Sequence, residues 1–217
     1  MDLVTASYTE QAALWPPTGR HVLAQHDAET VIVYQAFRPS IANFAIRHGS
    51  FGHDFSYARM SWIKPNFLWM MYRSGWGTKE DQEMTLGLRL GRRFFDGILG
   101  QAVASSLGES CFEREEDWKA ALRSSEARLQ WDPDHDPHGR AVARRAIQLG
   151  LRGSLLEAFG KRELLEVIDM TAFVEAQRAE LQRSGTSRLR TPLERLYVPG
   201  DEAVAKRLGL DRPADTS

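Results

Sequence analysis

Short strand patterns and short helix patterns follow one another irregularly along this chain, and this irregular order most limits the fold. Residues 31–36 (VIVYQA) are β-branched and aromatic, which is typical of a strand, and Pro39 ends that strand. The apolar positions of residues 41–48 have helical spacing, and Gly49 ends that helix. Because a parallel α/β fold needs a regular alternation of strand and helix, we expect an α+β fold.

Similar patterns continue to residue 184. We therefore expect one compact α+β domain over residues 1–184, with a mixed or antiparallel sheet flanked by short helices. The further predicted strands are 59–63, 84–90, 127–131, 146–151 and 164–169, and the further predicted helices are 67–73, 94–104, 154–159 and 171–181. Prolines and a glycine in residues 1–29 predict a loop-rich lead-in. Prolines return after residue 184, so residues 185–217 are expected to form an extended C-terminal tail.

Composition excludes several classes of protein. The length of 217 residues fits one domain, and the net charge of −1 excludes a protein that is basic overall. One cysteine, Cys111, excludes an intrachain disulfide and a zinc site built from cysteines. The longest apolar run, 67–72, is far shorter than a membrane span, and the N-terminus lacks a signal-peptide pattern. We expect a cytoplasmic protein without a membrane partner, and its oligomeric state is left open.

The charge is unevenly distributed. Residues 31–79 hold six basic side chains against one acidic side chain, which gives a local charge of +5. Within them, residues 60–79 (MSWIKPNFLWMMYRSGWGTK) contain three of the six tryptophans and three of the six methionines. Aromatic faces beside cations can hold a flat base and its phosphates. The alternative is a core role, in which Trp and Met fill the interior and the cations extend from its edge.

The run WIKPNFLWMMYRSGWGTK resembles a microbial family that is known only as a domain of unknown function. The likeness covers roughly residues 20–175 and includes VIVYQAFRPSIANFA, QWDPDHDP and RAIQLGLRG. This resemblance implies a single domain. It brings no activity, cofactor or catalytic residues.

The order of polar residues on the predicted strands is similar, more loosely, to ADP-ribosyltransferase-like folds. Those folds have a polar residue of the nicotinamide site on a first strand and a Gln-x-acid motif on a late strand. The resemblance implies Gln35, Gln130 and Asp132 as catalytic residues, with Asp132 supplying charge near the ribose. It also implies NAD as the cofactor and a transferase reaction. The chain departs from the pattern, because Gln35 stands in place of His or Arg and Asp132 in place of Glu.

Eight further side chains are candidates for binding a nucleotide or another phosphate-bearing ligand. In this hypothesis Tyr34 lines the pocket, Trp69 or Tyr72 stacks on a ring, and Arg38 or Arg73 binds pyrophosphate. The full set is Tyr34, Arg38, Lys64, Trp69, Tyr72, Arg73, Trp76 and Lys79. Two alternatives stay open: a non-catalytic module that binds RNA or DNA through the same surface, and a protein interface anchored by the Trp/Met segment.

The other motifs give weaker indications of function. Residues 75–79 (GWGTK) lack the spacing of a P-loop, although their N–H groups and Lys79 remain candidates for contacting one phosphate. Residues 132–138 (DPDHDPH) cluster carboxylates and imidazoles, but Pro137 stands where a calcium loop requires glycine. We therefore expect a hydrated turn over residues 132–140 and no metal. Neither G-x-G-x-x-G nor G-x-S-x-G occurs, which disfavours a Rossmann site and a hydrolase elbow.

Overall fold

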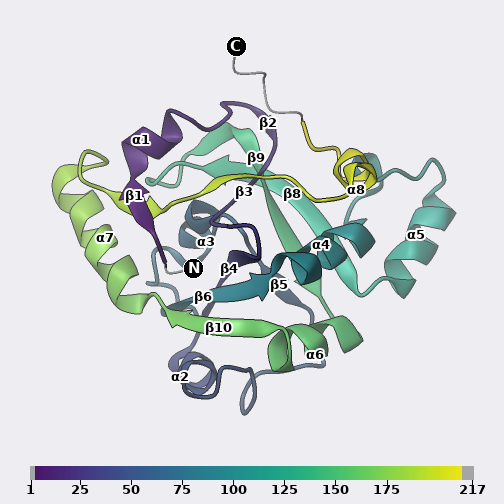
Figure 1. Cartoon of the computed structure of the whole chain (residues 1–217), viewed down its shortest axis with the longest axis horizontal. Coiled ribbons are helices and arrows are strands. Elements are labelled where there is room, and N and C mark those ends of the chain that lie inside the picture. The colour runs from purple at the N-terminus through teal and green to yellow at the C-terminus, as the bar shows by residue number, and fades with distance from the viewer. Residues whose placement is uncertain (1–2, 212–217) are drawn as a thin grey trace.

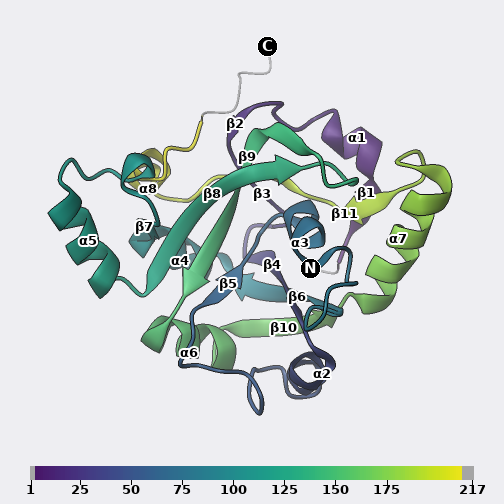
Figure 2. The same cartoon turned by 180° about the vertical axis from the view of Figure 1, so that it is seen from behind.

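The computed structural model describes residues 3–211 of the chain. Figures 1 and 2 show helices arranged around two connected groups of strands. The expected α+β architecture in one compact domain is thereby confirmed. None of the helices in residues 3–211 combines the length and the apolar character that a membrane crossing needs.

The first group of strands is antiparallel and contains β4 (Thr30–Phe37), β6 (Met84–Gly91) and β10 (Leu164–Asp169), in the order β10-β6-β4. Strand β4 pairs with β6 along its whole length. Its side chains alternate between two faces, as the pleat requires. Val31 and Val33 enter one hydrophobic core, whereas Ile32 and Tyr34 enter a second core beneath helix α3 (Phe67–Ser74).

The second group is built on the long antiparallel pair β8 (Ala127–His135) and β9 (Ala141–Leu151). Three short strands extend it, namely β2 (Gly19–Arg20), β5 (Ser61–Ile63) and β7 (Val103–Ala104). Residues 61–64 connect the two groups, because β5 pairs with β9 while Lys64 forms an isolated bridge with Tyr34 of β4. The chain that carries Lys64 is therefore held by both groups of strands.

The remaining helices lie around these strands. Helix α2 contacts β4, β6 and β10, and α7 contacts β6. The helices before the C-terminal segment, apart from α3, are α1 (Tyr8–Ala12), α2 (Pro39–His48), α4 (Arg92–Gln101), a 3₁₀ turn (Leu107–Glu109), α5 (Glu115–Ser124), α6 (Gly153–Lys161) and α7 (Thr171–Ser184).

Residues 185–211 do not form the expected extended tail. Strand β11 (Arg190–Pro192) pairs with β1 (Thr5–Ser7), and β12 (Arg195–Tyr197) pairs with β3 (Val22–Ala24). A last helix, α8 (Glu202–Arg207), follows. Figure 1 shows this yellow-green segment crossing the molecule beside the purple N-terminal segment. The expectation was wrong here because strands this short show no periodicity, and their partners lie far away in sequence. Residues 212–217 of the expected tail lie outside the described residues.

The expected turn over residues 132–140 is shorter in the structure. Strand β8 continues to His135, with a register shift between Pro133 and His135 that accommodates the proline. The turn itself is held by Asp136, whose Oδ1 accepts the N–H groups of His138 and Arg140, both at 2.9 Å. Asp132 therefore lies on a strand, where the pairing of β8 with β9 sets its position.

Candidate functional site

A cavity of about 390 Å³ opens where helix α3 faces β5, β8 and β9, and we call it the α3–β8 cleft. Its volume lies within the range of about 300–1,000 Å³ that is typical of small-molecule sites. Its walls carry two cations, two indoles, two amides and one carboxylate: Trp62, Lys64, Trp69, Arg73, Gln130, Asp132 and Gln148. The structure thus brings together five of the predicted site residues, namely Lys64, Trp69, Arg73, Gln130 and Asp132.

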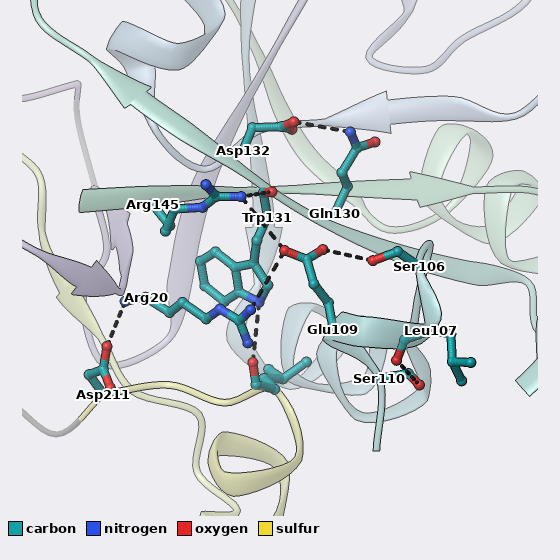
Figure 3. Close-up of polar contacts among 11 residues, drawn as sticks. Arg20, Ser106, Leu107, Glu109, Ser110, Gln130, Trp131, Asp132, Arg145 and Asp211 are labelled. Atoms are coloured by element: carbon teal, nitrogen blue, oxygen red, sulfur yellow. Dashed lines mark hydrogen bonds and ion pairs between the residues drawn. The ribbon is translucent and has the colours of Figure 1, made fainter. Parts of the chain in front are cut away.

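Strand alternation aims Gln130 and Asp132 at the same side of β8. Trp131, between them, points to the opposite side, where its Nε1 donates to the carbonyl of Leu208 at 3.2 Å (Figure 3). Gln130 Nε2 donates to Asp132 Oδ1 at 3.0 Å, and Gln148 Nε2 donates to Asp132 Oδ2 at 2.7 Å. Both carboxylate oxygens are therefore held in place by neighbouring amides.

Local capping signals position the helical part of the site. Helix α3 begins after Asn66, whose Oδ1 accepts the Trp69 N–H at 2.7 Å, and it ends at Gly75 with φ at +58°. Glycine suits this left-handed conformation because it has no Cβ. Trp69 and Arg73 are four residues apart, so they project from the same face of the helix into the cleft.

The two cations of the cleft lack carboxylate partners. Lys64 is 6% exposed, and its Nζ donates to the carbonyl of Trp62 at 3.3 Å. Burial, reinforced by the charge of Arg73 and opposed by that of Asp132, lowers the pKa of Lys64 to about 8. Arg73 is exposed in the last turn of α3. Within residues 3–211, neither cation has a carboxylate oxygen within 4.0 Å, so both remain able to bind an anion.

Carboxylates engage the arginine of another cavity. A larger cavity of about 700 Å³ lies between β3, β12 and α8 and contains none of the predicted site residues. There the Arg20 N–H donates to Asp211 at 2.8 Å, and the Arg20 guanidinium lies 3.6 Å from Glu109. Figure 3 shows this network continuing to Arg145, which also lies 3.6 Å from Glu109. The α3–β8 cleft is the better candidate because it gathers five predicted site residues, and because neither Lys64 nor Arg73 has an ion pair within residues 3–211.

Three stacked rings form one side of the site. Tyr72 stacks on His135 with ring centroids 3.5 Å apart, and Trp69 lies 5.2–5.3 Å from both rings in nearly parallel planes. Tyr72 is 40% exposed and does not line the cleft. Part of the aromatic surface predicted to stack on a ligand is thus occupied by neighbouring rings. His135 carries no ligand-binding prediction from the sequence, and it joins the site only through this stack.

Two predicted residues lie behind the cleft. Gln35 is buried, and its Nε2 donates to Ser61 Oγ at 2.7 Å and to the carbonyl of Trp62 at 3.1 Å. The same carbonyl accepts the Lys64 ammonium, so Gln35 supports the wall that carries Lys64. Tyr34 points away into the core beneath α3, because adjacent residues of β4 face opposite ways. Burial and the nearby charge of Glu194 raise the pKa of Tyr34.

Three other predicted residues also lie outside the cleft. Arg38 is 3.4 Å from Asp54 in a separate groove, and Trp76 Nε1 donates to the carbonyl of Pro137 at 3.2 Å. Lys79 Nζ donates to the carbonyl of Arg73 at 2.6 Å. The backbone N–H groups of residues 75–79 cap the end of α3. A phosphate contact by this loop would therefore require the helix cap to open.

Sequence reasoning missed two cleft residues as ligand candidates, Trp62 and Gln148. Gln148 is the cross-strand partner of Gln130, so only the β8–β9 register places it beside Asp132. The Trp62 ring lies over Gly150 of β9, where an added Cβ would come within 3.0 Å of it. Trp62 could have been predicted from its position in the aromatic and cationic segment of residues 60–79. No local sequence pattern around Gln148 indicates a ligand-binding role.

A family model described as a domain of unknown function, DUF4291, matches residues 21–197. A comparison with curated proteins gives no match. The matched range contains all seven residues that line the α3–β8 cleft.

Proposed function

The chain belongs to the DUF4291 family of unknown function, and we propose from its α3–β8 cleft that it binds a nucleotide. One observation carries the proposal: Lys64 and Arg73, without a carboxylate ion pair in residues 3–211, meet two indoles in one cavity. Nucleotides combine the anionic and aromatic groups that such a cavity recognises.

The cationic part of the cleft suits a phosphate. A buried ammonium without a carboxylate in direct contact is costly, and a bound anion reduces that cost. The Arg73 guanidinium can donate two parallel hydrogen bonds to phosphate oxygens, and it is exposed enough to meet an incoming ligand. Arg73 therefore binds the phosphate in this proposal, and Lys64 lies beside the phosphate in the wall of the cleft.

The remaining walls suit a ribose and a ring. Trp62 offers apolar ring surface, and Trp69 has a buried Nε1 without a hydrogen-bond partner in the described residues. The amides of Gln130 and Gln148 and the carboxylate of Asp132 can exchange hydrogen bonds with hydroxyl groups and ring nitrogens. Five of the seven lining residues are polar or charged, so a ligand would be recognised mainly through hydrogen bonds and charge, with the two indoles supplying ring surface.

Within this proposal NAD is the donor, and its ADP-ribosyl group passes to a nucleophilic acceptor as the bond between ribose and nicotinamide breaks. The carboxylate of Asp132, held by two amides, would stabilise the positive charge that develops on the ribose as nicotinamide leaves. Gln130 and Gln148 act as positioning residues for that carboxylate. Gln35 positions Trp62 and Lys64 through their shared carbonyl. The expected cytoplasmic location is part of the same proposal.

Calorimetric titration of the full chain with NAD and with ADP-ribose tests this function. The proposal predicts saturable binding of one ligand per chain. Binding of a single-stranded oligonucleotide with a steep salt dependence, and no binding of either nucleotide, would instead support the non-catalytic nucleic-acid module. Absence of both kinds of binding would contradict a nucleotide site in the cleft.

A further inference from the structure

Lys64 is held in one place by its backbone and by its side chain. Its N–H donates to the carbonyl of Tyr34 at 3.1 Å, and its own carbonyl accepts the Tyr34 N–H at 2.7 Å. Buried Pro65 follows, and the Nζ donates to the carbonyl of Trp62. The amine therefore occupies a fixed position in the wall of the α3–β8 cleft.

The charged groups that face this amine are Arg73 of α3 and Asp132 of β8. The cation opposes protonation of Lys64 and the carboxylate favours it, while burial opposes it most. With a pKa of about 8, a much larger fraction of Lys64 is neutral near pH 7.5 than of a lysine with the ordinary value. Desolvation and a neighbouring cation are the conditions that make a lysine nucleophilic.

We infer that Lys64 is a nucleophilic amine that forms an imine with the carbonyl group of a ligand whose phosphate is anchored by Arg73. This role rests on the proposed function only in its use of Arg73 for phosphate. It goes beyond phosphate binding in two respects. It gives Lys64 a covalent role, and it identifies the substrates of the cleft as phosphorylated aldehydes and ketones.

The step balances without an oxidant, a reductant or a metal. The lone pair of the neutral Nζ attacks the carbonyl carbon, a C–N bond forms, and the carbonyl π electrons move to oxygen. Protons pass from nitrogen to oxygen, the C–O bond breaks, and one water leaves as the imine forms. Asp132 is the carboxylate among the seven lining residues, and it faces Lys64 closely enough to favour its charged form. Because no oxygen of Asp132 lies within 4.0 Å of the amine, the protons would pass through water, and Asp132 contributes its negative charge to the iminium that forms.

The other lysines provide internal controls. Lys119 lies 2.7 Å from Glu115, and Lys161 lies 3.4 Å from Glu157, and all four of these side chains are exposed. Neither amine shares the burial of Lys64 or its place in the α3–β8 cleft. Lys119 is the matched comparison because it lies on α5, outside the cleft.

The probe for the test is pyridoxal 5′-phosphate, which carries an aldehyde and a phosphate on one small ring. The full chain is treated at pH 7–9, the imines are reduced with borohydride, and labelled lysines are mapped by mass spectrometry. We expect Lys64 to be labelled at least tenfold faster than Lys119, with a rate that rises through a midpoint near pH 8. Inorganic phosphate and the Arg73→Ala substitution should each slow labelling of Lys64 and leave Lys119 unchanged.

Labelling of Lys64 no faster than that of Lys119 overturns the inference, as does labelling that Arg73→Ala leaves unchanged. The comparison is made on the wild-type protein, so it does not depend on whether a Lys64 variant folds. If Lys64 is labelled selectively while NAD and ADP-ribose neither bind nor protect it, the nucleotide proposal fails and this inference stands. If the nucleotides bind and Lys64 is not selective, only this inference fails.

Discussion

Gln148 on β9 donates a hydrogen bond of 2.7 Å to Asp132 on β8, so the carboxylate in the cleft is oriented by the neighbouring strand. The second oxygen of Asp132 accepts from Gln130, two residues earlier on its own strand. A carboxylate with both oxygens engaged loses little orientation freedom when a ligand binds. This preorganisation is what electrostatic stabilisation of a developing charge requires.

The substitution Asp132→Asn keeps the size of the side chain and removes its charge. If this charge stabilises the transition state, release of nicotinamide from NAD should slow about 100-fold or more, with NAD affinity changed only a few-fold. Chromatography of released nicotinamide measures the rate. Asp136→Asn is the matched control, since Asp136 lies in the turn of the same hairpin and outside the cleft. A rate unchanged by Asp132→Asn would contradict the role.

Intrinsic fluorescence should report ligand binding through Trp62. A nucleotide ring packed against this indole should quench part of the protein's tryptophan emission, and Trp62→Phe should remove most of that change. Trp118→Phe is the control, because Trp118 lies on α5 and does not line the cleft, so its replacement should leave the quenching intact. Equal quenching in both variants would place the ligand elsewhere.

The buried carboxyl of Glu194 should make stability depend on pH. It accepts the Phe67 N–H at 2.7 Å at the start of α3, and burial raises its pKa well above the ordinary value of 4.5. The folded state then holds a proton that the unfolded state releases, so stability falls as pH rises from 4.5 towards the folded pKa. The decline from this group is at most about 1.4 kcal/mol per pH unit.

The substitution Glu194→Gln removes that titration. Its stability relative to the wild type should therefore rise with pH above 4.5, as measured by urea unfolding at several pH values. A difference between the two proteins that is constant from pH 4.5 to 8 would show that Glu194 is ionised normally in the folded state.

The C-terminal segment should be required for folding. A chain that ends at Ser184 lacks β11 and β12, the carboxyl of Glu194, and the buried side chains of Leu189 and Tyr197. We expect this truncated chain to lose cooperative urea unfolding, which circular dichroism detects, because it exposes the partners of those strands in β1 and β3. Cooperative unfolding with wild-type stability would contradict the structural role of residues 185–211.

Local signals predicted the elements that depend on local physics. Helix α3 was expected because Pro65 precedes it and Gly75 ends it, and strand β4 because its residues are β-branched and aromatic. Long-range pairing could not be predicted in the same way. Gln148 enters the cleft only through the β8–β9 register, and β12 was missed because its partner β3 lies about 170 positions earlier.

The same distinction applies to the candidate site. Lys64 and Arg73 were chosen from a local excess of cations, and the structure places both in one cavity. Tyr34 was chosen as a neighbour of Gln35, but strand alternation turns it into the opposite core. Lys79 was chosen as part of a glycine-rich loop, but its amine binds a carbonyl at the end of α3. A local sequence pattern does not predict which way a side chain points or which group in the folded protein it binds, because both depend on the tertiary structure.

The most direct test of the account is the affinity of the full chain for ADP-ribose, measured by calorimetry in wild type, Arg73→Ala and Arg47→Ala. Arg47 is an exposed arginine of α2 that lies outside the cleft, so its removal changes net charge equally. The account predicts saturable binding by wild type, at least about tenfold weaker binding by Arg73→Ala, and unchanged binding by Arg47→Ala. Equal weakening in the two variants, or no binding by wild type, would contradict a nucleotide site in the α3–β8 cleft.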